Sequence, residues 1–319
     1  NTDSLFVSAI AGAGLTTGEP VILSSGAAVS RAPDGALVYD PRGHFDGLAL
    51  GQAASDTFRY RIEDGHGGSA EALVTVVIEG RNDAPRAIAD TATIDADSTG
   101  IAIAVLANDD DIDSDDTGAT LRVVSATANS GAIVSFSGSP GAGVFYQPNG
   151  RFQALGAGET VTDVIDYAVE DRYGARSTAS VAVTVHGVND APVAVIDNPT
   201  VDEDAGAILG LLANDVDPDT HDTLRVVAID GASIITGGPV VLASGSIVSL
   251  DASGGLLWSP AASYQSLALG ETATEQFRYR IADGNGGFAE ADAFLRIEGR
   301  NDAPVARPDT ASAGEDGPP

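Results

Sequence analysis

The chain contains no cysteine, so neither a disulfide nor a thiolate metal site can hold it together. Metal ions bound by oxygen ligands are the remaining inorganic means of cross-linking the chain. Basic residues are scarce as well: 16 lysines and arginines stand against 46 acids, for a formal charge of -30. A surface that negative repels nucleic acid and anionic membranes and attracts multivalent cations. Polyanionic partners are therefore not expected.

Long apolar runs are also missing. The nearest is 207–213, far short of the roughly 18 residues of a membrane span, so no membrane insertion is expected in this segment. There is no N-terminal secretory signal. Because the sequence starts in the middle of a repeat, we interpret it as a piece of something longer.

Catalytic signatures are absent too. The sequence has no Gly-x-Ser-x-Gly elbow, phosphate-cradling loop or His-Glu-x-x-His motif, and its four histidines are scattered. His221 lies beside an acidic loop, where it is either a ligand or a surface residue. Paired carboxylates are plentiful, so residue count alone leaves a glycosidase-like pair open. We nevertheless expect a protein that is not an enzyme.

One phrase occurs three times in the sequence. It reads Gly-x-Asn-Asp-Ala-Pro and begins at Gly80, Gly187 and Gly299, at intervals of 107 and 112 residues. Hydrophobic residues make up 43% of the chain, too many for a disordered acidic tail, and 319 residues are enough for about three domains with cores. The interval is the size of one β-sandwich, so each copy marks a domain boundary. A shift of 219 residues lays 1–85 on 220–304 without a gap, with about half of the positions identical.

The apolar pattern has a period of two residues. Val181, Val183 and Val185 alternate with smaller or polar residues, as Phe277, Tyr279 and Ile281 alternate with arginines. Such short runs recur between Gly, Asp, Asn and Pro clusters, with no helical pattern of useful length. The sequence predicts an all-β fold of tandem antiparallel β-sandwiches of immunoglobulin or cadherin type. We expect sandwiches at 1–83 (without its first strands), 84–190 and 191–302, and the leading strand of a further repeat at 303–319.

Two glycine-rich segments, 64–68 and 283–287, lie between the last two strands of their units. Glycine permits the positive φ angles of a tight hairpin. A calcium-binding nonapeptide coil needs several consecutive copies, whereas each unit has one. We interpret both segments as turns.

Acidic clusters follow the first two boundary phrases. They are Asn-Asp-Asp-Asp-Ile-Asp at 108–113, followed by Asp115 and Asp116, and Asn-Asp-Val-Asp-Pro-Asp at 214–219. Carboxylates at alternate positions converge when the backbone curls, and a hard cation such as calcium takes six to eight such oxygens. A solvated acidic loop is the usual fate of a charge run. Repetition at the same point of two units favours a calcium site instead.

The combined motif order resembles the cadherin-like (VCBS-type) tandem repeats of giant bacterial adhesins of the repeats-in-toxin class. It runs from Gly-x-Asn-Asp-Ala-Pro through Glu-Asp and Leu-Ala-Asn-Asp-x-Asp-x-Asp to Gly-Glu before Phe-x-Tyr-x-Ile and Asp-Gly-x-Gly-Gly. The resemblance covers essentially the whole chain. It implies a secreted, calcium-stiffened extender at the cell surface, exported through a type I system, that mediates attachment or biofilm formation.

The resemblance also implies the calcium ligands at each junction between sandwiches. The second junction would use Glu159, Asn189, Asp190, Glu203 or Asp204, Asp215, Asp217, Asp219 and Asp283. The first would use Asn82, Asp83, Asp97, Asp109, Asp111, Asp113 and Asp171, with Gln52 and Ala96 where acids are expected, and hence weaker binding or fewer ions. The third would use Glu271, Asn301, Asp302, Glu315 and Asp316.

A tandem array of such repeats has two expected kinds of partner. One is the neighbouring repeats of the same chain, and the other is further copies with which it self-associates into filaments or bundles. A calcium-dependent polysaccharide-binding module is the alternative, although aromatics are only 5% of the chain and its one tryptophan, Trp258, is expected in the core. A second alternative is a filament subunit in which 303–319 adds a strand to the open first sandwich of another copy.

Overall fold

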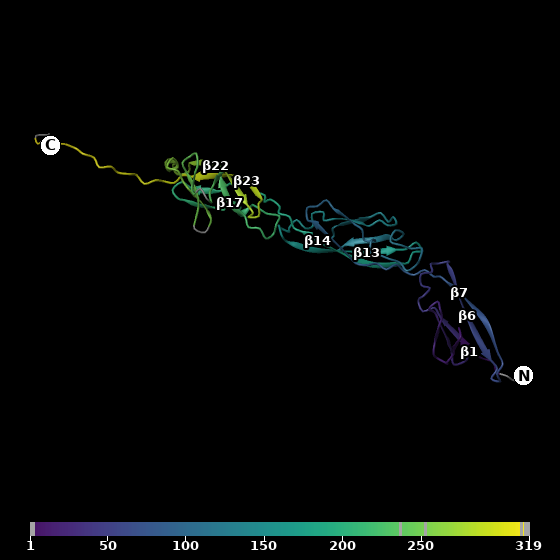
Figure 1. Ribbon diagram of the computed structural model, residues 1–319. Coiled ribbons are helices and arrows are strands. Elements are labelled where there is room, and N and C mark those ends of the chain that lie inside the picture. The colour runs from purple at the N-terminus through teal and green to yellow at the C-terminus, as the bar shows by residue number, and fades with distance from the viewer. Residues whose placement is uncertain (1–3, 236–237, 252–253, 313–314, 316–319) are drawn as a thin grey trace. The chain divides into compact units, whose positions relative to one another are not determined.

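A computed structural model describes residues 4–235, 238–251, 254–312 and 315, and these residues form β-structure (Figure 1). Their only helical elements are two 3-10 turns, η1 (Leu211–Ala213) and η2 (Tyr264–Ser266). The predicted all-β fold class is confirmed. Contacts group the chain into two compact units, Asn1–Phe152 with Thr160–His186, and Gln153–Glu159 with Gly187–Pro319. The sandwich boundaries drawn from the repeats stay a prediction.

The N-terminal part of the first unit has two sheets. One has the order β2-β1-β6-β7 and consists of β1 (Phe6–Ile10), β2 (Ala13–Gly14), β6 (Ala53–Glu63) and β7 (Ser69–Glu79). The other has the order β3-β4-β5 and consists of β3 (Val21–Ile22), β4 (Ala28–Arg31) and β5 (Leu37–Asp40). Their core contains Ile10, Leu23, Val29 and Phe58.

The rest of the first unit again consists of a four-stranded and a three-stranded sheet. One sheet has the order β10-β13-β14-β8, from β8 (Asp90–Asp95), β10 (Arg122–Ala128), β13 (Thr160–Glu170) and β14 (Arg176–His186). The other has the order β11-β12-β9, from β9 (Ile101–Ile103), β11 (Ile133–Phe136) and β12 (Val144–Gln147). Tyr146, Ile165 and Val183 are among its fully buried side chains.

The second unit also has two sheets. The order β15-β23-β22-β17-β18 joins β15 (Thr200–Asp202), β17 (Arg225–Ile229), β18 (Ala232–Ser233), β22 (Thr272–Ala282) and β23 (Phe288–Glu298). The order β16-β21-β20-β19 joins β16 (Ala207–Leu209), β19 (Val240–Val241), β20 (Ile247–Leu250) and β21 (Leu256–Ser259). The core includes Trp258, which is fully buried, so the prediction of a core position for this residue is confirmed.

Two strand pairs depart from the predicted antiparallel pattern. β8 runs parallel to β14, with Asp90 opposite Val181 and Asp95 opposite His186, and β15 runs parallel to β23. Because β8 is parallel to β14 and β15 is parallel to β23, the chain leaves the first strand of each pair at the same end of the sheet at which the last strand ends. This path of the chain decides which acids can meet, as described below.

The long hairpins place the acidic residues at their tips. β13 and β14 pair without interruption over 11 residues, and so do β6 with β7 and β22 with β23. The tips at 64–68 and 283–287 are the predicted turns, with positive φ at Gly65, Gly67, Gly284 and Gly286. That prediction is confirmed, and each tip begins with an aspartate.

A buried carboxylate links the two sheets in each of the three strand sets. In the first, Asp56 accepts hydrogen bonds from Ser25 (2.6 Å) and from the Tyr39 hydroxyl (2.9 Å). Asp163 takes the same place with Ser130 and Tyr146, and Glu275 with Ser244 and Trp258. Burial, with the bond to Asp56, raises the pKa of Tyr39 to about 12. The carboxylate is an aspartate where its partner is a tyrosine hydroxyl, and it is the longer glutamate where its partner is the indole N–H of Trp258.

This pairing predicts a coupled effect. We expect Glu275→Asp to lower the free energy of unfolding by about 1–3 kcal/mol, because the shortened carboxylate leaves the buried indole N–H of Trp258 without its acceptor. Adding Trp258→Tyr should recover at least about 0.5 kcal/mol relative to the sum of the single changes. Urea unfolding of the four proteins in a double-mutant cycle measures this, and additive effects would contradict it.

Candidate metal centres

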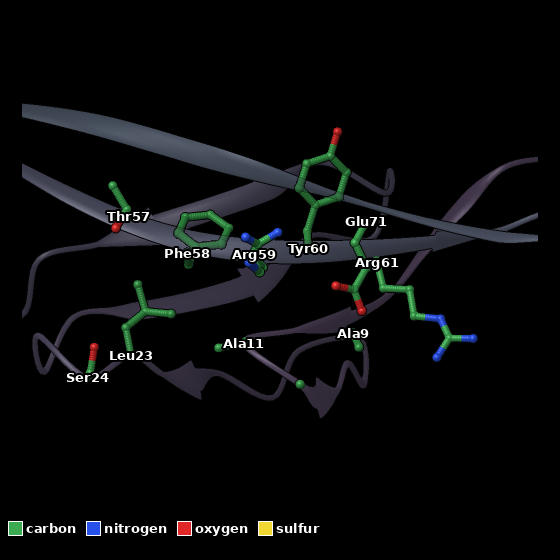
Figure 2. A pocket seen from close by; sticks show the side chains of 11 residues that line it. Ala9, Ala11, Leu23, Ser24, Thr57, Phe58, Arg59, Tyr60, Arg61 and Glu71 are labelled. Atoms are coloured by element: carbon green, nitrogen blue, oxygen red, sulfur yellow. The ribbon is translucent and has the colours of Figure 1, made fainter.

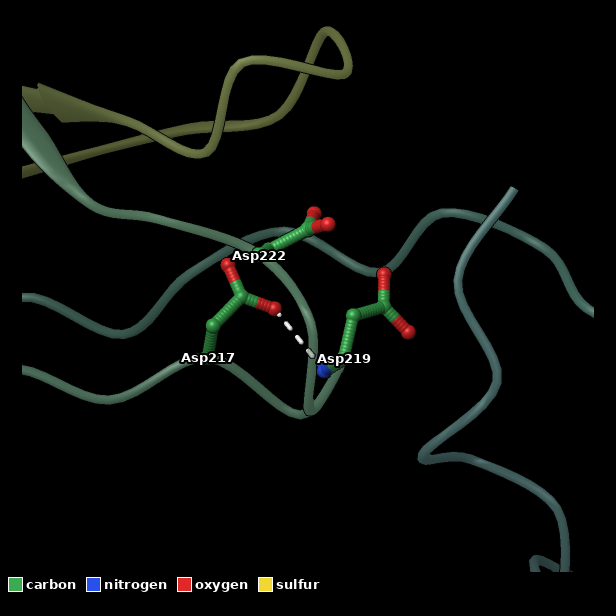
Figure 3. A group of neighbouring side chains, drawn as sticks. All are labelled: Asp217, Asp219 and Asp222. Carbon is green, nitrogen blue, oxygen red and sulfur yellow. Dashed lines mark hydrogen bonds between the residues drawn. The ribbon is translucent and has the colours of Figure 1, made fainter. Parts of the chain in front are cut away.

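The loop before β17 gathers three aspartates. Figure 3 shows Asp217, Asp219 and Asp222, each offering a carboxylate oxygen that lies within 4.8 Å of the others. The loop curls because the Asp219 N–H donates to Asp217 Oδ1 at 2.9 Å. Asp219 is 2% exposed. A curl of this kind brings alternate side chains together, as the sequence pattern predicted.

Residues of the boundary phrase and of the hairpin tip adjoin this loop. The Asp190 N–H donates to Asp219 Oδ2 at 2.9 Å, and Asn189 Nδ2 donates to Asp283 Oδ2 at 2.9 Å. At the tip, Asp283 Oδ1 accepts the N–H groups of Asn285, Gly286 and Gly287. Although burial alone would raise the pKa of Asp283, these bonds outweigh it and lower that pKa. We call Asn189, Asp190, Asp217, Asp219, Asp222 and Asp283 the second cluster.

Glu159 lies next to the second cluster. Its Oε2 accepts the Gly156 N–H at 3.0 Å, and a Cβ placed on Gly156 would lie 3.5 Å from the Asp219 carboxyl carbon. Its Oε1 lies 2.8 Å from Nδ1 of His221, whose side chain is 78% exposed. The structure thus makes His221 an exposed partner of a glutamate.

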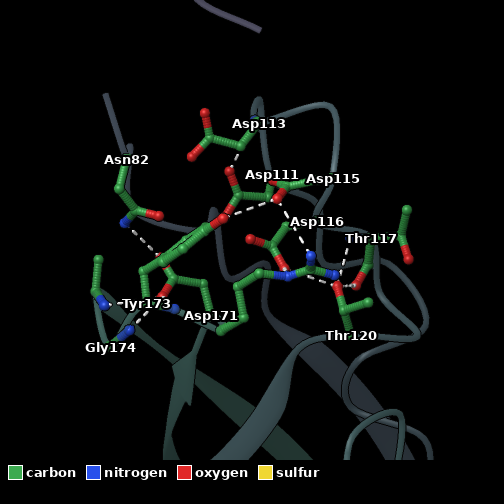
Figure 4. Close-up of polar contacts among 12 residues, drawn as sticks. Asn82, Asp111, Asp113, Asp115, Asp116, Thr117, Thr120, Asp171, Tyr173 and Gly174 are labelled. Atoms are coloured by element: carbon green, nitrogen blue, oxygen red, sulfur yellow. Dashed lines mark hydrogen bonds and ion pairs between the residues drawn. The ribbon is translucent and has the colours of Figure 1, made fainter. Parts of the chain in front are cut away.

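The first unit repeats these hydrogen bonds in a second set of residues, the first cluster, most of which Figure 4 shows. Asp113 N–H donates to Asp111 Oδ1 at 3.0 Å, Asp83 N–H donates to Asp113 Oδ2 at 2.9 Å, and Asn82 Nδ2 donates to Asp171 Oδ2 at 2.8 Å. The tip again places three N–H groups on Asp171 Oδ1. We define the first cluster as Asn82, Asp83, Asp111, Asp113, Asp115, Asp116 and Asp171.

Both clusters leave oxygens without hydrogen-bond partners although these oxygens are buried. Among the described residues they include Asn82 Oδ1, Asp111 Oδ2, Asp113 Oδ1, Asp115 Oδ1 and Asp116 Oδ2 in the first cluster, and Asn189 Oδ1, Asp217 Oδ2, Asp219 Oδ1 and Asp222 Oδ2 in the second. Asp113 and Asp219 are 1% and 2% exposed. A buried carboxylate oxygen without a partner is costly, so these sets suit a hard cation that takes oxygen ligands.

The charges in these clusters predict how the metal-free protein responds to pH. Burial raises the pKa of Asp111, Asp113 and Asp217, and the neighbouring carboxylates add to the increase. Since these pKa values exceed the unfolded value of about 3.9, the folded state binds more protons than the unfolded chain above that value. Stability without metal should therefore rise as the pH falls from neutral towards ~5.

Thermal melts in EGTA should show this effect. We expect a higher melting temperature at pH ~5 than at pH ~7, because the clustered aspartates take up protons in the folded state. Acids whose pKa is lowered, such as Glu170 between Arg122 and Arg176, stabilise the folded state while they are ionised. They lose this stabilising effect only below about pH 4.3. A melting temperature that falls steadily between these two pH values would contradict the expectation.

Several residues implied by the resemblance lie together as expected: Asn82, Asp83, Asp111, Asp113 and Asp171 in one cluster, and Glu159, Asn189, Asp190, Asp217, Asp219 and Asp283 at the other. Their role as calcium ligands stays a prediction. The ligand set implied by the sequence does not include Asp115, Asp116 and Asp222. Asp116 and Asp222 each follow the last aspartate of their pattern by three residues, and that shared offset is the available signal.

The assignment of Glu203 to the second junction is wrong. Its Oε1 accepts the Arg300 N–H at 2.5 Å and its Oε2 accepts the Leu267 N–H at 3.2 Å, which places it beside the third boundary phrase. Asp204 follows it there, next to the charge of Asp302. The reason is that β15 has already carried the chain along β23 before Glu203 is reached.

The assignment of Asp97 to the first junction is wrong for the same reason. Ala96 N–H donates to the carbonyl of His186, at the opposite end of β14 from the tip with Asp171. Neither Ala96 nor Asp97 therefore bears on the charge of the first cluster. With Asp115 in the place of His221, that cluster also has no deficit of acids, so a shortage of charge gives no reason to expect weaker binding there.

Asp109 and Asp215 hold the chain that follows each boundary phrase. Asp109 Oδ1 accepts the Ile88 N–H and Asp215 Oδ1 accepts the Val195 N–H, each at 2.7 Å. The Tyr279 hydroxyl lies 3.1 and 3.3 Å from the two oxygens of Asp215, which gives this residue a positioning role. Asp109 Oδ2 has no partner among the described residues, so its role as a ligand stays a prediction.

The described residues among those expected at the third junction do not form a cluster like the other two. Glu271 Oε2 accepts the Ala268 N–H at 2.9 Å, as Glu159 does with Gly156. Asn301, Asp302 and Glu315 are exposed, and Asp316 lies outside the described residues. A ligand role for these residues stays a prediction.

A hollow on the first strand set offers no comparable site. Figure 2 shows Leu23, Phe58, Arg59 and Glu71 among its lining side chains, and its volume is about 450 Å³. The lining contains no histidine and only one acid, so it lacks both the acid–base pair of a glycosidase and a set of metal-ligating side chains. Within the described ranges no helix is long and apolar enough to cross a membrane.

Comparisons with known proteins agree with the repeat pattern. The bacterial Ig domain model matches residues 2–77 and 82–184, and the bacterial cadherin-like domain model matches residues 189–299. Domains EC22-24 of mouse cadherin-23 are similar in structure, with a TM-score of 0.50 and 14% identity over 92% of this chain and 85% of that one. Mouse clustered PcdhgC3 EC1-3 gives a TM-score of 0.49 and 15% identity over 92% of this chain and 88% of that one. No curated protein matches the sequence.

Proposed function

The chain belongs to the bacterial Ig domain family, and from that premise we propose that it is an extender segment of a secreted bacterial adhesin or extracellular matrix filament, stiffened by calcium. It would serve at the cell surface in attachment or biofilm formation. Its work would be mechanical rather than enzymatic, with neighbouring repeats of the same chain as its first partners.

One observation carries the proposal: each cluster holds buried oxygens without partners, on residues of a boundary phrase and of an aspartate loop, and the aspartate of a hairpin tip is hydrogen-bonded to the same phrase. Backbone N–H groups fix the outer oxygens of Asp113, Asp171, Asp219 and Asp283. The inner oxygens are thereby held in place before any ion binds. Calcium, when bound, would supply the positive charge that these oxygens lack.

Stiffening follows from the origin of the ligands. A short linker between sandwiches leaves their orientation free by default, since contacts between domains are small. Asn82 and Asp83 belong to such a linker, as do Asn189 and Asp190, and both pairs are hydrogen-bonded to an aspartate loop and a hairpin tip. Ligation of all three segments by one set of ions would fix the linker. Without the ion only these hydrogen bonds hold the linker, and the mutual repulsion of the carboxylates opposes them.

The proposal is tested by calcium titration calorimetry and small-angle scattering. We expect saturable binding, and a larger maximum dimension in calcium than in EGTA. The double variant Asp217→Asn with Asp219→Asn should lose the binding due to the second cluster. Identical scattering profiles and melting temperatures in calcium and in EGTA would refute the calcium-stiffened extender.

A further inference from the structure

The two clusters have similar acids but different counter-charges. Each has six carboxylates in or beside it: Asp83, Asp111, Asp113, Asp115, Asp116 and Asp171 for the first, and Glu159, Asp190, Asp217, Asp219, Asp222 and Asp283 for the second. Among the described residues, an arginine bridges two acids in the first cluster and none does so in the second. Arg172 directly follows the tip aspartate, at the position that Gly284 occupies in the second unit.

Arg172 bridges two acids of the first cluster. Its Nη1 lies 3.2 Å from Asp115 Oδ2 and its Nε lies 3.2 Å from Asp116 Oδ1. The Tyr173 hydroxyl donates to the same Asp115 oxygen at 3.0 Å. The guanidinium therefore occupies one oxygen of each carboxylate, and the other oxygens, Asp115 Oδ1 and Asp116 Oδ2, stay buried without hydrogen-bond partners.

The corresponding contact in the second cluster is neutral. Asp222 Oδ1 accepts a hydrogen bond from Asn285 Nδ2 at 2.7 Å. Asp222 and Asp116 are equivalent, since each follows the last aspartate of its loop by three residues. One cluster thus has a full positive charge at its rim and the other has an amide. Asp116 is also the more buried of the two, at 4% exposed, whereas the Arg172 side chain is 42% exposed, so water screens part of the attraction between them.

We propose that Arg172 is a built-in counter-cation of the first cluster, so that this cluster holds together without calcium and fills at a higher calcium concentration than the second. The inference rests on the proposed function, since it assumes that both clusters take calcium. A fixed positive charge several ångströms from a divalent ion disfavours binding of that ion. The same charge offsets the repulsion among the carboxylates when no ion is present. The array would then stiffen in steps rather than all at once.

The experiment uses the full chain with Asp217→Asn and Asp219→Asn, so that calcium binding reports on the first cluster. In that background Arg172→Gln should bind calcium about tenfold more tightly, as expected for the loss of one nearby charge. Its melting temperature in EGTA should be lower than that of the parent. Arg172→Lys, which keeps the charge, should resemble the parent in both measurements. Arg151→Gln removes an exposed arginine of the same strand set and should change neither.

The outcomes separate the two ideas. Unchanged or weaker calcium binding by Arg172→Gln, in a chain that still binds calcium, overturns the counter-cation and leaves the proposed function standing. Binding by none of the chains, the unmodified one included, refutes the proposed function itself. Circular dichroism in EGTA shows whether each variant keeps its β-structure, and Arg172→Lys keeps the proposal testable if Arg172→Gln does not fold.

Discussion

Replacing Asp219 by asparagine should weaken calcium binding at the second cluster by about a hundredfold, since affinity in such sites follows the number of charged ligands. Asp219 is the central member of the cluster: it accepts the Asp190 N–H through Oδ2, and its Oδ1 is buried without a partner. Asparagine keeps an acceptor for the Asp190 N–H. It therefore removes the charge and leaves the geometry of the loop in place.

The same substitution should stabilise the metal-free protein by about 1 kcal/mol, because it removes repulsion from Asp217 and Asp222 in a buried setting. The two opposite effects are the signature of an ion site, since a merely structural aspartate would lose stability in both conditions. Calcium titration and urea unfolding in EGTA measure them. Asp309→Asn, a change of equal charge at an exposed position, should have neither effect.

A destabilised metal-free Asp219→Asn would contradict this account. So would equal calcium affinity of the variant and the unmodified chain. Asp113→Asn provides an independent check in the first unit, where Asp113 has the same contacts with Asp83 and Asp111.

The fold is largely predictable because strand alternation and turn residues are local signals. The alternation of Val181, Val183 and Val185 predicts that they face inward, and all three are fully buried. Trp258 aligns with Tyr39 of the matching unit, and the two side chains indeed bind the same buried carboxylate position. The parallel first strands are not predictable in this way, since alternation shows that a strand exists and says nothing about its neighbour or its direction.

The clusters are predictable only in part, for a related reason. Asp111, Asp113, Asp217 and Asp219 occur as close pairs in the sequence, so a single curl brings each pair together. Glu203 precedes the aspartate loop closely in the sequence, yet it lies against the backbone of Leu267 and Arg300 because β15 intervenes. Distance along the chain is a poor guide wherever a strand crosses the sandwich.

The glycine of the boundary phrase has a physical cause that the sequence does not show. A Cβ on Gly187 would lie 2.2 Å from the Gly156 carbonyl oxygen and 2.5 Å from that of Leu155. Gly80 and Gly299 meet the carbonyls of Ala49 and Ala268 in the same way. Each glycine also donates its N–H to the residue at the matching position of that loop, which is Gln52, Glu159 or Glu271. The phrase therefore begins where two backbone segments come too close for a side chain.

Gly187→Ala should accordingly lower the free energy of unfolding of the second unit by about 3 kcal/mol, because backbone atoms rather than a flexible side chain must move. Any shift of Gly187 also moves Glu159 through their hydrogen bond and displaces Asn189 two residues later, so calcium binding should weaken as well. Urea unfolding followed by the fluorescence of Trp258, the single tryptophan, reports on this unit. Gly210→Ala is the matched control: its Cβ would meet nothing within 4 Å, and its φ of -87° suits alanine. Equal stability of the two alanine variants would show that the close approach at the boundary is not what requires glycine there.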